Sequence, residues 1–187
     1  MRKKVSILRL SHRVIRDKRI TTHLALVCRA FGAMCMYYTG DRDTDMENNI
    51  RKVNETWGNS FNIKYISDPH EFVKNWRKRG GTVIHLTMYG EPLIDTIGTI
   101  KKLNDLLLIV GSEKVDAYYF KISDYNISIT NQPHSEIAAV AVFLDYYYGG
   151  AEFRFKYKDP RLRIVPSKRR KIIEIVKNKD FNISVNK

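Results

Sequence analysis

The chain has 187 residues, of which 43% are hydrophobic, so it is long enough for one α/β domain plus a modest appendage and too apolar for wholesale disorder. No run approaches the ~18 apolar residues of a membrane span, and Arg9, Arg13 and Arg16 leave no signal-peptide core, so we expect a cytoplasmic protein without membrane attachment. The net charge of +13 points to a polyanionic partner.

Strand and helix patterns alternate along the chain, which predicts a mostly parallel α/β sheet. Strands are expected at residues 5–10, 34–38, 61–66, 82–88, 106–110 and 125–129. Helices are expected at residues 21–31, 45–57, 68–79, 92–104, 116–122 and from 135 to the glycines at 149–150. The sequence therefore predicts one α/β domain with a mostly parallel sheet in residues 1–150.

Residues 151–187 differ in composition from the rest and are expected to form a separate extension. Aromatic and basic residues alternate between Phe153 and Ile164, which predicts a β-hairpin with one apolar and one basic face, and residues 167–179 resemble a short basic helix. The basic face suits RNA phosphates, whereas the apolar face suits a helix or a second subunit. RNA docking and dimer support both remain open for this extension.

The positive charge lies at the two ends of the chain. Residues 1–30 hold nine Lys and Arg against one acid, and residues 151–187 hold twelve against four. The intervening segment is mildly acidic, with twelve bases and fifteen acids. This asymmetry favours nucleic acid as the partner over charge that serves solubility alone.

Nothing in the sequence predicts a metal site. Cys28 and Cys35 lie seven residues apart, which fits no zinc spacing, and we expect both to be small buried side chains. The histidines also lack metal-ligand spacing, and His85, inside an apolar strand, is expected to be a hydrogen-bonded core residue. The five histidines are His12, His23, His70, His85 and His134.

Two loops follow buried strands and are candidates for ligand binding. Gly111 ends the most apolar strand, and Thr130-Asn131-Gln132-Pro133 follows the last one. Ligands of open α/β sheets bind at the carboxyl ends of strands, although each loop also fits a plain strand-to-helix turn. Neither loop carries a glycine-rich dinucleotide fingerprint or a Walker lysine, so nucleotide sites of those kinds are not supported.

At these loops the sequence resembles a known superfamily. Residues 107–115, LLIVGSEKV, and 124–142, DYNISITNQPHSEIAAVAV, are similar to the second and last motifs of the SPOUT RNA methyltransferases. Residues 16–32, RDKRITTHLALVCRAFG, are similar to the first motif. With residues 85–90, HLTMYG, the combination resembles the archaeal tRNA (cytidine-56-2′-O)-methyltransferase family over residues 5–167.

This resemblance implies a Rossmann-like sheet with a C-terminal deep trefoil knot, a homodimer whose interface completes the active site, and S-adenosylmethionine bound in the knot. It implies methylation of tRNA at the ribose 2′-oxygen of the T-loop cytidine at position fifty-six. The implied cofactor contacts, mostly through backbone groups, are Leu86, Gly111, Ser112, Glu113, Lys114, Val115, Ile129, Thr130, Asn131, Gln132, Pro133, His134, Ser135 and Glu136.

The first motif departs from the superfamily pattern D-x-x-N-x-x-x-x-x-R. Counting from Asp17, the Asn and Arg positions hold Ile20 and Leu26, so the usual arginine cannot be transferred. Arg19 and His23 lie one helical turn apart and are our candidates, Arg19 to stabilise a developing alkoxide and His23 as general base. Other basic residues nearby remain possible, namely Arg9, Arg13 and Arg29.

Two alternatives to this function stay open. The chain could be a catalytically silent RNA-binding protein on the same scaffold, or a methyltransferase that modifies a different RNA nucleotide. A measurement of cofactor binding distinguishes the silent RNA-binding protein from the enzyme. Mapping of the modified nucleotide distinguishes a methyltransferase for another nucleotide from one for the cytidine at position fifty-six.

Overall fold

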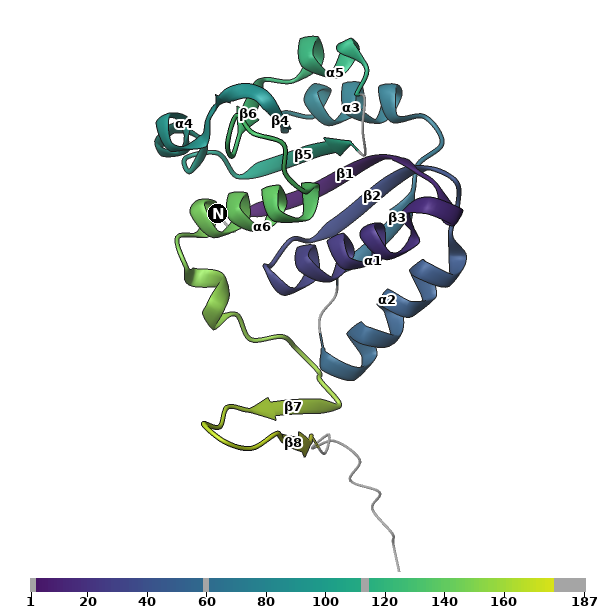
Figure 1. Ribbon diagram of the computed structural model, residues 1–187, viewed down its shortest axis with the longest axis vertical. Helices are drawn as coiled ribbons and strands as arrows, with labels where there is room; N and C mark the ends of the chain where they lie inside the picture. The colour runs from purple at the N-terminus through teal and green to yellow at the C-terminus, as the bar shows by residue number, and fades with distance from the viewer. Residues whose placement is uncertain (1–2, 59–60, 112–114, 177–187) are drawn as a thin grey trace, which may run out of the picture.

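The computed structural model describes residues 3–58, 61–111 and 115–176. Its centre is a six-stranded, all-parallel sheet in the order β3-β2-β1-β5-β4-β6 (Figure 1). The strands are β1 (Lys4–His12), β2 (Cys35–Gly40), β3 (Asn62–Tyr65), β4 (Thr82–Pro92), β5 (Asp105–Gly111) and β6 (Tyr125–Ser128). Strands β1 and β5 lie in the middle of the sheet. Residues 106–110 of β5 are all apolar and buried, as expected for a strand covered on both faces, whereas β1 also buries the polar Ser6, Arg9 and His12.

Helices cover both faces of this sheet and make two apolar cores. Side chains of α1, α2, α4 and α6 share one core, and those of α3 and α5 share the other. Figure 1 shows α1 and α6 side by side on one face. The helices are α1 (Val14–Ala30), α2 (Thr44–Trp57), α3 (Pro69–Lys78), α4 (Leu93–Ile100), α5 (Ala117–Ile122) and α6 (Glu136–Tyr148). No helix in the described ranges is both long and apolar enough to cross a bilayer.

The predicted alternation of strands and helices up to residue 150 is confirmed, although several elements begin or end at other residues than expected; for example, α4 ends at Ile100 and not at residue 104. Helix α1 begins at Val14, seven residues before the expected start, because its first turns face the sheet with polar Asp17 and Thr21, which an apolar pattern does not detect. Strand β4 continues through Tyr89 and Gly90 to Pro92, because Glu91 and Pro92 pair with β6 beyond a bulge.

The predicted β-hairpin of the C-terminal extension is present, but its position and the predicted helix after it are wrong. Residues Ala151–Arg154 form a short 3-10 helix, and the hairpin consists of β7 (Leu162–Val165) and β8 (Ile172–Ile175). Strand β8 lies where a helix at 167–179 was expected, and residues beyond 176 lie outside the described part.

The aromatic residues expected in the hairpin instead fix the connection to the body. The Phe155 ring packs against Tyr148 and over Gly32, and the Tyr157 hydroxyl donates to the Ala30 carbonyl at 2.7 Å. The contacts of these rings with α1 and α6 outweigh the two-residue alternation. The hairpin follows as a separate projection (Figure 1).

Candidate functional site

Three neighbouring strands, β5, β4 and β6, end at the same edge of the sheet and carry the residues expected to bind the cofactor. Leu86 lies in β4 just before the bulge, with its side chain buried in the core. Gly111 ends β5 and pairs with Leu10 of β1. The structure therefore brings the expected loops together at the edge where parallel sheets bind ligands.

Gly111, at the end of β5, lies in close contact with Val115. A Cβ at Gly111 would overlap the Cγ2 of Val115, so glycine is the residue that fits here without a shift of the valine side chain. Val115 is partly buried and packs on the core between β5 and α5. Ser112, Glu113 and Lys114 lie outside the described residues.

The segment between β6 and α6 is exposed and bonded to the bulge of β4. The Asn131 side-chain amide donates to the Met88 carbonyl at 2.7 Å. Ser135 caps α6 by accepting from the Ile137 amide at 3.1 Å, and Ile129 is packed against the core. Thr130, Asn131, Gln132, Pro133, His134 and Ser135 are all exposed, and Glu136 is half-buried.

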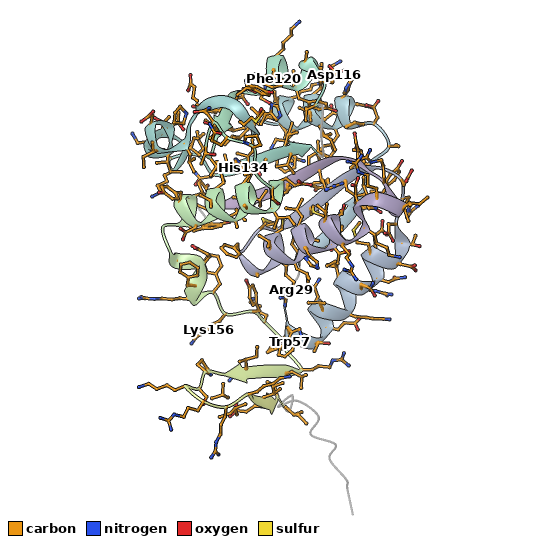
Figure 2. All side chains as sticks on the ribbon, viewed as in Figure 1. Arg29, Trp57, Asp116, Phe120, His134 and Lys156 are labelled. Carbon is orange, nitrogen blue, oxygen red and sulfur yellow. The ribbon has the colours of Figure 1, made fainter. Side chains whose placement is uncertain are left out.

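Two histidines near these loops differ in burial. His134 is exposed and lies at the entry to α6 (Figure 2). His85 is 1% exposed, its Nδ1 lies 3.1 Å from Asn126 Oδ1, and burial lowers its pKa. The expectation that His85 is a hydrogen-bonded core residue is confirmed.

A buried arginine lies between the two helices that flank this edge. Arg9 of β1 is fully buried, and its Nη2 lies 3.3 Å from Glu136 Oε1 and 3.8 Å from Asp17 Oδ2. Burial by itself would raise the pKa of Asp17, but the bonds from Arg13 and the charge of Arg9 hold it below the usual value. The three charged groups therefore join β1, α1 and α6.

A second polar cluster continues from the end of β1. His12 is fully buried, with Nδ1 2.8 Å from the Thr21 hydroxyl and Nε2 3.6 Å from Asp43 Oδ2. Burial and the charge of Arg9 lower the pKa of His12, so the ring stays neutral near pH 7. Sequence reasoning did not find either cluster. The available signal was Arg9 itself, a charged residue at the inward position after Val5 and Ile7 in a buried strand.

The candidate catalytic residues lie on the outer face of α1. Arg19 and His23 are both exposed and both inside the helix, which places them one turn apart as expected. Asp17 and Thr21 face the sheet, and Arg19 lies about 200° around the helix from each. Arg19 and His23 therefore point away from the sheet that carries the loops of the same chain.

Other features of the motif and of the surface lie outside this arrangement. Ile20 is 41% exposed and Leu26 packs against the core, so neither position holds a polar group.

A cavity of about 630 Å³ lies at the opposite ends of the strands, between α3 and the start of β4. Its lining includes Lys74, Arg77 and Asp124. No cluster of metal-ligating side chains occurs among the residues that the structure describes.

The fold is similar to those of solved RNA methyltransferases. The structure is similar to the TrmH/SpoU tRNA modifying enzyme of A. aeolicus, with a TM-score of 0.61, 14% identity, and coverage of 82% of this chain and 78% of that one. It is also similar to the SpoU methyltransferase AviRb of Streptomyces viridochromogenes, solved in complex with the cofactor AdoMet, with a TM-score of 0.58, 14% identity, and coverage of 81% and 59%. The fold is that of the SpoU methyltransferases, a mostly parallel α/β sheet.

Sequence comparison defines the family more narrowly. A family model described as tRNA ribose 2′-O-methyltransferase, aTrm56, matches residues 57–174. The tRNA (cytidine(56)-2′-O)-methyltransferase of Methanopyrus kandleri is 47% identical over 168 residues, covering 90% of this chain and 94% of the relative. The enzyme of the same name from Sulfurisphaera tokodaii is 48% identical over 165 residues, covering 87% and 96%. The chain belongs to this family of tRNA ribose 2′-O-methyltransferases.

Proposed function

We propose that this protein transfers a methyl group from S-adenosylmethionine to the ribose 2′-oxygen of the tRNA cytidine at position fifty-six. The observation that carries the proposal is the 47% identity over 90% of the chain to an enzyme named for that reaction. The loops meeting at the ends of β4, β5 and β6 support it, because they supply a site at the appropriate edge of the fold. A tRNA substrate agrees with the cytoplasmic location expected from the sequence.

The residues at this edge fit the cofactor. Gly111 has no side chain, so a ligand can approach its backbone closely, and the exposed segment 130–135 offers backbone and side-chain donors and acceptors. Adenine and the amino-acid group are recognised by such donors and acceptors. When bound, S-adenosylmethionine supplies a methyl group already activated by its sulfonium. The protein has to hold the ribose 2′-oxygen in line with that methyl and remove its proton, and alignment of this kind can contribute ~7–11 kcal/mol.

Arg19 and His23 are assigned to the reacting oxygen. A guanidinium beside the 2′-oxygen stabilises its developing negative charge, and a neutral imidazole accepts its proton. Both side chains point away from the loops of their own chain, so they serve the site of a second subunit. Ile15 and Ile20 on α1 are 101% and 41% exposed, which supports a partner surface there and hence a homodimer.

The knot is part of the same proposal. Residues 87–90 bulge away from β6 between the Leu86 and Glu91 pairings, and Asn131 bonds to that bulge after β6 has passed it. This contact between the segment after β6 and the bulge of β4 agrees with the expected knot, in which the chain leading to α6 passes through a loop formed earlier. Residues 151–187 form the extension, and its exposed bases Arg154, Lys156 and Arg163 suit RNA phosphates.

A matched pair of variants tests the catalytic assignment. Arg19→Ala and Lys18→Ala remove the same charge from adjacent exposed positions of α1, and Lys18 faces Asp45 of α2 at 3.7 Å. In single-turnover methylation of unmodified tRNA, we expect Arg19→Ala to lower the rate by about 100-fold or more and Lys18→Ala to leave it within about threefold. A full rate for Arg19→Ala removes Arg19 from the mechanism.

Two further measurements test the activity and its target. Calorimetry with S-adenosylmethionine should show binding, and its absence would favour a silent RNA-binding protein. Mapping of methylated nucleotides after incubation with unmodified tRNA should place the group on the cytidine at position fifty-six. A methyl group on another nucleotide would show that the protein is a methyltransferase with a different target nucleotide.

A further inference from the structure

The buried position of Arg9 is unusual for a charged side chain. Its side chain is 0% exposed, and its Nε and Nη1 have no hydrogen-bond partner among the described residues. Only Nη2 reaches carboxylates, Glu136 at 3.3 Å and Asp17 at 3.8 Å. Burying a guanidinium costs free energy that such pairing often fails to recover, and apolar replacements of buried ion pairs are often neutral or stabilising. Stability alone therefore does not account for Arg9.

Its location suggests what it does instead. Arg9 pairs with Val110 of β5, one residue before Gly111, so it lies beneath the cofactor edge of the sheet. Glu136 is the first residue of α6 and ends the exposed segment expected to bind the cofactor. Asp17 lies in the first turn of α1, two residues before Arg19. One buried cation is thus in reach of the helix that carries Arg19 and the loop that carries the cofactor contacts.

We infer that Arg9 is a positioning residue, which holds Glu136 and thereby sets the conformation of the 129–136 segment for S-adenosylmethionine. This inference rests on the proposed function. Glu136 depends on Arg9 more than Asp17 does, because Asp17 Oδ2 also accepts from the Arg13 Nε at 3.1 Å and the Arg13 backbone amide at 3.2 Å. Loss of Arg9 should therefore change the conformation at the start of α6 more than that of α1.

Arg29 provides a matched control on the neighbouring helix α1. It is 7% exposed, its Nε donates to Asn54 Oδ1 at 2.9 Å, and its Nη2 donates to the Gly58 carbonyl. Figure 2 shows Arg29 near Trp57, well apart from His134 at the entry to α6. Arg29→Met removes a buried arginine without touching the cofactor edge, so it reports the cost of losing such a side chain in this protein.

The test is a double-mutant cycle measured by calorimetry. We expect Arg9→Met and Glu136→Gln each to weaken S-adenosylmethionine binding about tenfold, which corresponds to ~1.4 kcal/mol. The double variant should bind no more weakly than the poorer single variant, because both changes break the same contact. Arg29→Met should lower the unfolding temperature yet leave the Kd within about twofold, and Arg9→Lys should recover part of the affinity.

The possible outcomes separate this inference from the proposed function. The positioning role is wrong if Arg9→Met and Arg9→Lys bind the cofactor as tightly as the wild type. It is also wrong if the losses of affinity in Arg9→Met and Glu136→Gln multiply in the double variant. Neither result contradicts the proposed methyltransferase activity. If Arg9→Met does not fold, Arg9→Lys and Glu136→Gln decide, and unchanged affinity in both rejects the role. If the wild type binds no cofactor, the proposed function fails first.

Discussion

The side-chain amide of Asn131 donates to the carbonyl of Met88 at 2.7 Å, which joins the segment after β6 to the bulge of β4. Asn131→Ala should loosen that segment and raise the Kd for S-adenosylmethionine about tenfold, the loss of ~1.4 kcal/mol. Asn48→Ala is the control, because Asn48 is an exposed asparagine of α2 whose side chain is also hydrogen-bonded, to Arg51 at 2.9 Å, and it is not among the residues expected to bind the cofactor. Equal affinities for the two variants would show that the Asn131 hydrogen bond does not shape the site.

Gly111 and Val115 should show compensation. In Gly111→Ala the new methyl group overlaps Val115 Cγ2, so the turn has to shift, and cofactor binding should fall by at least about tenfold. Adding Val115→Ala removes the obstructing methyl groups and should restore part of the affinity. Calorimetry on the single and double variants checks this, and a double variant as weak as Gly111→Ala would place the defect elsewhere.

The basic residues of the extension should govern tRNA binding. Neutralising Arg154, Lys156 and Arg163, all exposed, should weaken binding and reduce the slope of log K against log salt by up to about 2, or ~0.7 for each phosphate that the protein no longer neutralises. The Kd for S-adenosylmethionine should not change. Filter binding at several salt concentrations measures the slope, and an unchanged slope would argue for dimer support as the role of the extension.

Glu152 makes the folded state sensitive to pH. It is 5% exposed, burial raises its pKa, and the neighbouring Asp145 raises it further. A raised pKa means that the folded state binds the proton more tightly, so this contribution to stability is present at low pH and lost as pH rises through the folded pKa. Glu152→Gln should raise the unfolding temperature near pH 7 by roughly 2–4 °C and have little effect near pH 4.

The control for that experiment is Glu174→Gln, at an exposed position of β8, which should leave the unfolding temperature unchanged at both pH values. A Glu152→Gln variant with the same gain at low and neutral pH would contradict the assignment, because the effect would then not depend on ionisation.

The buried His12 makes stability depend on pH in the opposite sense to Glu152, because its stabilising contribution is lost at low pH. Burial lowers its pKa, so the unfolded state binds the proton more tightly, and the stability that the neutral ring contributes is lost as pH falls from about 6.5 toward the folded pKa. His12→Asn should reduce stability at pH 7 and flatten the pH dependence below about 6.5. Thermal unfolding across that range measures it, and an unchanged slope would show that His12 does not titrate there.

The order of strands and helices in the first 150 residues could be predicted because apolar periodicity is a local property. The five apolar residues Leu106–Val110 predict a buried strand, and Gly111 marks its end. The family motifs likewise are contiguous stretches of sequence. The extension could not be predicted in the same way, because contacts of Phe155 and Tyr157 with distant elements override their alternation.

The sequence by itself therefore determined the α/β class, the loops at the strand ends, the basic extension and the family. Only the tertiary structure decided which polar groups meet, because Arg9 and Glu136 are 127 residues apart and no local pattern relates them. It also decided that Arg19 and His23 face outward, since the buried Asp17 and Thr21 determine the rotation of α1 against the sheet. Burial selects among side chains by what surrounds them in space, and that information is absent from their order in the chain.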